Sequence, residues 1–368
     1  MRISKTWRTA AAVMAFGLIT TACTSDPATD STEEPTGDAV DDPTDPTTSD
    51  DASGSTADQV IARGSLICGV SGGLAGFSLN DGAGNFTGID VDYCRGVAAA
   101  VLGDADAVQY VELTAETRFT ALQSGEVDVL IRNGTWTASR DGELALQWAT
   151  TTYYDGQGML VNDSDAATEV QDMDGYNICV QTGTTTELNL QTYFDKLGIT
   201  YVPVNVVDEA AVTENFSAGT CDAYTTDRSG LASFKSTYTG DDVKILPDVM
   251  SKEPLGPATR QGDDKWFDLV NWTVFATFQA EEFGITSGDV DSFDAGTNAD
   301  IARFLGQEEG QTTGTGLGFP DELWAVRVIT AIGNYQEIFD RNITPLGLDA
   351  GVNQLWTEGG LHYAPPFR

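Results

Sequence analysis

Short apolar segments alternate with helix-forming segments in two successive parts of the chain, and this alternation constrains the fold more than any other feature. In the first part, predicted strands at residues 65–70 and 109–113 flank a helix that ends at Gly103. In the second part, residues 176–181 and 221–226 have the same strand pattern around another helix. Strands that alternate with helices predict parallel sheets covered by helices. The sequence therefore predicts an α/β protein with two similar lobes that close as a hinged clamshell.

The stretch 117–140 shows how the first lobe forms a ligand-binding edge. A short helix is expected to stop at Gly125, and residues 127–131 follow as a strand that is apolar on both faces. A loop comes next, and either Thr137 or Ser139 supplies a hydroxyl that can cap the following helix.

Ligands of open α/β sheets bind beyond the carboxyl ends of the strands, and Thr135 and Arg140 fall at this place. The guanidinium of Arg140 offers a planar fork of donors that matches a carboxylate. A surface salt bridge is the alternative interpretation of a lone arginine.

The second lobe offers the opposite charge. Asp227 follows the strand at 221–226 and can pair with an ammonium group. Thr184 and Glu187 fit a capping box before a helix at 188–197, whose first N–H groups can hold a carboxylate. Arg140 for a carboxylate and Asp227 for an ammonium together predict an α-amino acid as the ligand.

The N-terminal residues predict export. Residues 1–23 carry three basic residues, an apolar run and small residues before Cys23, which is the pattern of a secretory signal. The small residues before Cys23 are similar to a bacterial lipobox, so lipidation of Cys23 is expected; ordinary secretion is the alternative. Residues 24–58 hold 11 acidic residues and no Lys or Arg, and they predict a disordered acidic tether.

The formal net charge of −37 makes nucleic acid and anionic lipid surfaces poor partners. No cofactor or metal is predicted, because the sequence shows no cluster with the spacing of metal ligands. His362 is the only histidine in the chain.

Four cysteines follow Cys23, an even number that suggests disulfides in an exported protein. Of the three possible pairings, Cys68 with Cys94 and Cys179 with Cys221 is favoured because each pair stays within one predicted lobe. Buried free thiols are the alternative.

Two crossings between the lobes define the predicted domains. Residues 151–161 form a long strand-like segment that leaves the first lobe, and residues 251–258 return to it. Lobe 1 is expected to comprise residues 59–158 and 256–368, and lobe 2 residues 159–255. Helical patterns at 266–283, 300–305 and 322–339 are expected to cover lobe 1.

Motifs spread over residues 60–368 resemble the polar amino-acid-binding proteins of ABC importers, and most closely their general L-amino-acid branch. These motifs include C-G-V-S-G-G-L-A-G-F-S, R-N-G-T-W-T, C-V-Q-T-G-T-T-T-E-L-N-L, C-D-A-Y-T-T-D and S-K-E-P-L-G-P-A. The resemblance implies a type 2 periplasmic-binding-protein fold with two hinge strands, no enzymatic activity and a monomer. It also implies an extracytoplasmic protein, lipid-anchored to the outer face of the membrane or periplasmic, that delivers L-amino acids to a permease and its ATPase.

The resemblance also implies roles for single residues. Arg140 matches the arginine that grips the ligand carboxylate, and the hydroxyl of Thr135 assists it. Asn133 matches the residue whose backbone meets the ammonium group, and Asp227 matches the acid that binds it. Thr185 matches the contact from the second lobe to the carboxylate.

Four further residues are expected at the ligand. Phe77 lies where an aromatic ring often covers it, and Trp136 either contacts it or belongs to the core. Arg118 matches a side-chain contact of acidic-amino-acid binders or has a structural role. Ser71 stands where those binders have another arginine, which favours broad specificity.

Two other function classes are alternatives. An enzyme on the same scaffold, of the cyclohexadienyl-dehydratase type, would need acid–base chemistry, yet the sequence offers one histidine and no G-x-S-x-G motif. A sensory ligand-binding module would need a transmembrane output region, and none is predicted after residue 60. Turnover assays test the first alternative, and neighbouring permease and ATPase genes test the second.

Overall fold

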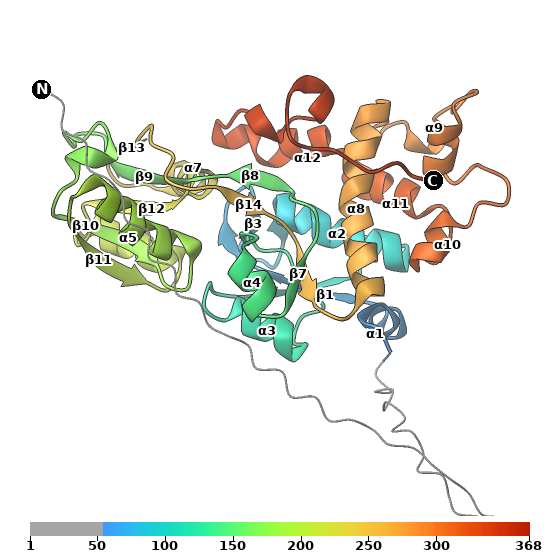
Figure 1. The fold of residues 1–368 in the computed structure, drawn as a ribbon, viewed down its shortest axis with the longest axis horizontal. Helices are drawn as coiled ribbons and strands as arrows, with labels where there is room; N and C mark the ends of the chain where they lie inside the picture. Colours follow the sequence, from blue (N-terminus) through green and yellow to red (C-terminus); the bar gives the residue numbers. More distant parts are fainter. Residues whose placement is uncertain (1–53) are drawn as a thin grey trace, which may run out of the picture. The chain divides into compact units, whose positions relative to one another are not determined.

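The computed structural model describes residues 54–368. The predicted signal at 1–23, the lipidation of Cys23 and the tether up to residue 53 lie outside the described residues. Within the described part, two five-stranded sheets each carry helices on both faces (Figure 1). The prediction of a two-lobe α/β architecture is confirmed. We call the sheet that contains β1, with its helices, the first lobe and the other sheet, with its helices, the second lobe.

The sheet of the first lobe has the order β5-β1-β6-β15-β7. Strand β1 pairs in parallel with β5 and β6, as predicted, but β15 pairs antiparallel with both β6 and β7. The prediction of purely parallel strands is wrong at this edge because β15 enters the sheet from the returning crossing. The strands are β1 (Leu66–Val70), β5 (Val108–Glu112), β6 (Val129–Leu130), β7 (Leu146–Trp148) and β15 (Ala258–Arg260).

One face of this sheet packs against the largest hydrophobic core. The predicted helix at 322–339 is in fact two helices, because Gly333 ends the first and Asn334 caps the second through a capping box with Glu337. The packed helices are α1 (Thr56–Arg63), α2 (Ile89–Leu102), α8 (Asp264–Phe283), α11 (Trp324–Ile332) and α12 (Tyr335–Asn342), with the shorter α9 (Ala299–Phe304) and α10 (Thr313–Leu317) beside them.

The opposite face carries α3 (Arg118–Ser124) and lies next to α4 (Ala138–Glu143). Helix α3 ends at Gly125, whose φ of 79° is a left-handed conformation that glycine adopts without strain. Of the two candidate caps for α4, Thr137 is the one used, because its hydroxyl accepts a hydrogen bond from the N–H of Arg140.

Helix α1 corrects the predicted tether. Its first residue is Thr56, so the expectation that the disordered segment reaches residue 58 is wrong. The hydroxyl of Ser55 caps the helix by accepting from Asp58 N–H, and Ala57 and Val60 are buried in the core of the first lobe. Asp58 also pairs with Lys265 at 3.0 Å. The apolar positions and the cap outweigh the acidic composition of the preceding residues.

The sheet of the second lobe has the order β11-β10-β12-β9-β13. Helix α5 packs on one face, and α6 and α7 pack on the other. Strands β9 and β13 run antiparallel within this sheet. The elements are β9 (Gln157–Asn162), β10 (Tyr176–Gln181), α5 (Thr185–Leu197), β11 (Tyr201–Val206), α6 (Glu209–Ser217), β12 (Ala223–Asp227), α7 (Arg228–Thr237) and β13 (Val243–Ile245).

Two short strands, β8 (Tyr153–Asp155) and β14 (Glu253–Leu255), pair antiparallel where the chain passes between the lobes (Figure 1). The long strand expected at 151–161 is broken at Gly156, which has no room for a side chain: a Cβ atom there would lie 2.6 Å from Val249. We call β8 and β14 the hinge strands.

The C-terminal residues hold one hinge strand. The side chain of Asn353 accepts a hydrogen bond from Tyr154 N–H at 2.6 Å and donates one to Tyr154 C=O at 3.0 Å. The hydroxyl of Tyr335 donates to Thr152 C=O. The remaining elements are β2 (Gly73–Leu74), β3 (Ser78–Asn80), β4 (Phe86–Thr87) and five short 3₁₀ segments, η1 (Val170–Asp172), η2 (Val290–Ser292), η3 (Thr344–Leu346), η4 (Gly351–Asn353) and η5 (Trp356–Glu358).

Both disulfides join the pairs favoured from the sequence. Cys68 of β1 is linked to Cys94 of α2, and Cys179 of β10 is linked to Cys221, which comes just before β12. Each bridge therefore stays within one lobe. Across residues 54–368, none of the helices combines the length and apolar character that a membrane crossing needs.

Candidate functional site

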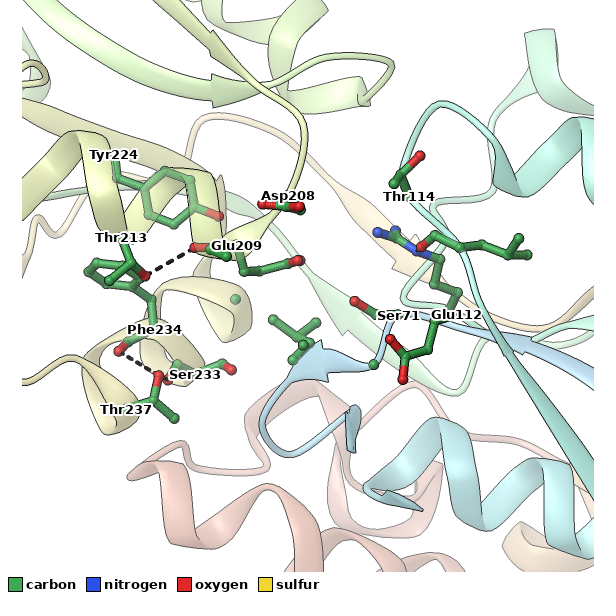
Figure 2. Close-up of a pocket in the computed structure, with 17 residues that line it drawn as sticks. Ser71, Glu112, Thr114, Asp208, Glu209, Thr213, Tyr224, Ser233, Phe234 and Thr237 are labelled. Carbon is green, nitrogen blue, oxygen red and sulfur yellow. Dashed lines mark hydrogen bonds between the residues drawn. The ribbon is translucent and has the colours of Figure 1, made fainter. Parts of the chain in front are cut away.

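A cavity of about 500 Å³ lies where the two lobes face each other. Figure 2 shows Ser71, Glu112 and Thr114 of the first lobe on one side and Asp208, Thr213 and Tyr224 of the second lobe on the other. The lining also includes Gly72, Gly73, Leu74, Leu113, Arg132, Glu209, Ala210, Gly230, Ser233, Phe234 and Thr237. Ser71 is therefore the one predicted ligand contact among these lining residues.

The loop after β6 holds Asn133 and Thr135 in a fixed conformation. Asn133 has a φ of 31°, which non-glycine residues adopt rarely, and its N–H donates to the carboxylate of Asp90 at 2.9 Å. Burial raises the pKa of Asp90 to about 6. Thr135 forms a backbone bridge with Leu255 of hinge strand β14. The loop that carries two predicted contacts is thus attached to the hinge.

Arg140 projects from α4 to the same loop. Its Nη1 donates to the carbonyl of Thr135 at 2.7 Å, and its guanidinium lies 4.8 Å from the ring centroid of Phe119. Arg118 lies 4.7 Å from the same ring, so two cations share one aromatic side chain. Burial lowers the pKa of Arg140 to about 10, and Glu253 and Asp227 oppose this shift. Arg140 therefore stays charged at neutral pH.

We call the region where the two lobes and the hinge strands meet the junction. Three carboxylates lie on its second-lobe side. Asp155 and Glu253 are direct partners on the two hinge strands, and Asp227 ends β12. Asp155 accepts hydrogen bonds from Gly156 N–H and Ser229 N–H. In the described part of the chain, the Asp227 side chain accepts no hydrogen bond, although it is only 6% exposed. Of the three carboxylates, Asp227 is thus the one without a hydrogen-bond donor among the described residues.

The pKa values report how these charges affect one another. Burial, followed by the charges of Asp155 and Glu253, raises the pKa of Asp227 well above its ordinary value. Burial also raises the pKa of Asp155 to about 6. Burial lowers the pKa of Arg118 far below its ordinary value, and the neighbouring Arg132 and Arg140 add to that effect. Three arginines therefore lie close together on one side of the junction, and three carboxylates lie close together on the other.

Opposite charges at the junction do not pair directly. Within residues 54–368, the six groups Arg118, Arg132, Arg140, Asp155, Asp227 and Glu253 form no ion pair with one another. Burying a charge without a partner costs several kcal/mol. A zwitterion with its carboxylate toward the arginines and its ammonium toward Asp227 would relieve both sides.

The first residues of helix α5 in the second lobe contact the first lobe at the junction. Thr184 caps it by accepting from Glu187 N–H at 3.1 Å, whereas Glu187 accepts from Gly183 N–H, so only half of the predicted capping box forms. The hydroxyl of Thr185 lies 3.4 Å from that of Thr135 in the first lobe. Thr185 and Arg140 also line a second cavity of about 440 Å³ between the lobes.

Phe77 and Trp136 lie in different surroundings. Phe77 is 1% exposed in the core of the first lobe, with its ring 5.5 Å from that of Tyr153, so its role as a ligand cover stays a prediction. Trp136 is 42% exposed and its indole N–H donates to Asp141, so the alternative of a core tryptophan is wrong. Its contact with the ligand also stays a prediction.

Sequence reasoning missed Asp155 and Glu253 as charged groups at the junction, and Arg132 beside them. Both acids lie within the predicted crossings between the lobes, but in a chain with 56 acidic residues this position alone does not single them out. Phe119, on the predicted helix that ends at Gly125, was also missed, although its ring lies against the guanidinium groups of Arg118 and Arg140.

His362 lies away from the cavity. It is buried among the rings of Tyr154, Phe278 and Tyr335, and neither ring nitrogen has a hydrogen-bond partner in the described residues. Burial lowers its pKa to about 3, so it is neutral at physiological pH. In the same part of the chain, no group of three His, Cys, Asp or Glu side chains is arranged to hold a metal ion.

Two α/β lobes, two hinge strands and a charged junction between the lobes define a solute-binding protein of the clamshell type. Residues 66–284 match the family of bacterial extracellular solute-binding proteins, family 3, and the chain belongs to this family.

Similar proteins come from several bacteria. The glutamate/glutamine/aspartate/asparagine-binding protein BztA of Rhodobacter capsulatus is 53% identical over 84% of this chain and 93% of its own length. The general L-amino acid-binding periplasmic protein AapJ of Rhizobium johnstonii is 50% identical over 84% of this chain and 92% of its own length. A periplasmic binding protein from Brucella ovis, solved with glutathione bound, superposes with a TM-score of 0.83 at 46% identity, covering 86% of this chain and all of that one.

Proposed function

We propose that this protein captures L-amino acids between its lobes, outside the cytoplasm, and delivers them to the permease of an ABC importer. The observation that carries the proposal is the set of six charged groups at the junction, five of them buried and Asp155 half-buried, that form no ion pair among themselves. The ligand carboxylate faces Arg140, and its ammonium faces Asp227, which has no hydrogen-bond donor of its own in the described residues. The names of BztA and AapJ support an amino-acid ligand.

Broad specificity follows if the protein holds the charges that all amino acids share. The cavity of about 500 Å³ leaves space for side chains of different sizes. Ser71 contributes no charge at its wall, and its hydroxyl has no partner within the described part. Binding energy concentrated on the α-carboxylate and α-ammonium groups would make affinity depend little on the side chain.

The experiment is calorimetric titration of the purified protein with each of the twenty L-amino acids. We expect binding of several amino acids and no binding of an amino acid whose carboxylate is replaced by an amide. Chromatography of the ligand after long incubation tests whether it is released unchanged, as expected for a protein that is not an enzyme. Failure of all twenty amino acids to bind would refute the proposal, and conversion of the ligand would favour an enzyme.

Glutathione is a second candidate ligand, because the structure from Brucella ovis is described with glutathione bound. Its glutamyl end carries the same free α-amino and α-carboxylate groups as an amino acid. The cavity of about 500 Å³ lies in the size range of pockets for drug-sized ligands, about 300–1,000 Å³. It therefore leaves room for the rest of a tripeptide. Competition between glutathione and L-glutamine in the same titration tests whether they share one site.

Anchoring through Cys23 is also part of the proposal and rests on the sequence alone. The lipidated protein is expected to fractionate with membranes, whereas a Cys23→Ser variant should be released. Mass spectrometry of the N-terminal peptide checks the modification. A protein that is released with Cys23 intact and unmodified would contradict the anchor without affecting amino-acid binding. Light scattering tests the expected monomer.

A further inference from the structure

Glu253 of hinge strand β14 is 1% exposed and has hydrogen-bond donors from two parts of the molecule. The hydroxyl of Thr185 donates to its Oε2 at 2.8 Å, and the amide of Asn189 donates to its Oε1 at 2.8 Å. The hydroxyl of Ser251 also donates to Oε1. Thr185 and Asn189 belong to α5 of the second lobe, so Glu253 attaches this helix to the hinge.

The bond to Glu253 fixes the direction of the hydroxyl at Thr185. A threonine hydroxyl has one proton to donate and lone pairs that accept. An ionised carboxylate only accepts, so the proton of Thr185 is used in its bond to Glu253. In the 3.4 Å contact between the two hydroxyls, Thr135 must then be the donor. The hydrogen bonds run from Thr135 through Thr185 to Glu253.

This direction has a consequence for a bound carboxylate. The oxygen of Thr185 presents lone pairs to the first lobe, and lone pairs repel a carboxylate. The backbone N–H of Thr185 has no acceptor within α5, because it is in the first turn of the helix. This N–H group and the helix dipole both favour a negative charge at that point.

We infer that Glu253 is a positioning residue of the ligand site. It binds the hydroxyl proton of Thr185, so that Thr185 meets the ligand carboxylate through its backbone N–H while its hydroxyl joins the two lobes through Thr135. This inference rests on the proposed amino-acid function. Glu253 acts through Thr185 and does not touch the ligand.

The test uses the full protein, L-glutamine as the probe, and four variants: Glu253→Gln, Thr185→Val, Thr185→Ser and the double variant Glu253→Gln/Thr185→Val. A hydrogen bond to a charged group corresponds to about a tenfold change in affinity or more. We expect Glu253→Gln and Thr185→Val each to bind about tenfold more weakly, mainly through faster dissociation. Thr185→Ser keeps the hydroxyl and should bind like the unaltered protein.

The double variant separates positioning from a general structural effect. If Glu253 acts through Thr185, the double variant should bind no more weakly than the weaker single variant, because residues in one hydrogen-bond network are not additive. Glu214→Gln is the matched control, since Glu214 is exposed on α6. It should leave both affinity and dissociation rate unchanged.

Three results would overturn the inference: unchanged affinity in Glu253→Gln, additive losses in the double variant, or equal affinity of Thr185→Val and the unaltered protein. If Glu253→Gln does not fold, the comparison of Thr185→Val with Thr185→Ser still decides, because the inference requires the hydroxyl. Failure of the proposed function looks different, because then the unaltered protein itself binds neither L-glutamine nor any other amino acid.

Discussion

Replacing Asp227 by Asn should weaken ligand binding while leaving the ligand-free fold at least as stable. Asp227 is buried, accepts no hydrogen bond within residues 54–368, and has a pKa raised well above its ordinary value by burial and two neighbouring carboxylates. At neutral pH its charge therefore opposes folding. Asparagine has nearly the same shape and removes that charge.

The size of the loss follows from the environment. Truncating one partner of a buried, hydrogen-bonded charge pair costs about 2–5 kcal/mol. At about 1.4 kcal/mol for each tenfold change, the dissociation constant for L-glutamine should rise by between about thirtyfold and about four thousandfold. Thermal unfolding of the ligand-free variant should shift upward, by about 2–4 °C for each kcal/mol gained.

Calorimetry and thermal unfolding at pH 7.5 measure the two effects on the same samples. Asp241→Asn is the matched control, because Asp241 is exposed on the loop after α7 of the same lobe. It should change neither quantity. An affinity of Asp227→Asn within about threefold of the unaltered protein would refute the assignment of Asp227 to the ammonium group. A marked fall in unfolding temperature would show that Asp227 stabilises the fold.

Three other changes test separate parts of the structure. Arg140→Lys should weaken L-glutamine binding about tenfold or more in calorimetry, because an ammonium group cannot form the paired bonds of a guanidinium; equal affinity would contradict a forked contact. Asp155 has a pKa raised to about 6, so its native form takes up a proton more readily than its unfolded form. The unaltered protein should therefore gain stability relative to Asp155→Asn as the pH falls from 7.5 to 4.5, measured by denaturant unfolding without ligand, and a difference that stays constant with pH would contradict this. Replacing Cys179 and Cys221 by Ser opens a bridge that spans 42 residues and should lower the free energy of unfolding by about 4 kcal/mol, measured with denaturant; a loss below about 1 kcal/mol would argue against the bridge as a major source of stability.

Helix ends were predictable because their signals are local. Gly103, Gly125 and Gly198 each end a helix in the left-handed conformation, as their positions after apolar helical patterns predict. Gly333 and Asn334 carry the same kind of signal, and the structure has two helices there where the sequence analysis predicts one.

Features that depend on contacts between distant segments were not predictable in this way. The antiparallel entry of β15 is set by pairing with β6 and β7, more than a hundred positions earlier in the chain. The opposed charges of Arg140 and Asp227 could be proposed because each follows a predicted strand. Glu253 could not, because a chain with 56 acidic residues gives no local sign of which carboxylate is buried.

The amide of Asn353 occupies the outer edge of hinge strand β8, 199 positions after Tyr154, which it binds. This edge would otherwise be open, because β8 pairs only with β14 within the described residues. The C-terminal segment packs with the first lobe, so its Asn353 fixes the Tyr154 part of hinge strand β8 to that lobe. We therefore expect rotation of the lobes to involve the residues of β8 after Tyr154, toward Gly156, more than Tyr154 itself. Deletion of the residues from Asn353 onward would therefore reduce the restraint on lobe rotation before it changed the groups that bind the ligand.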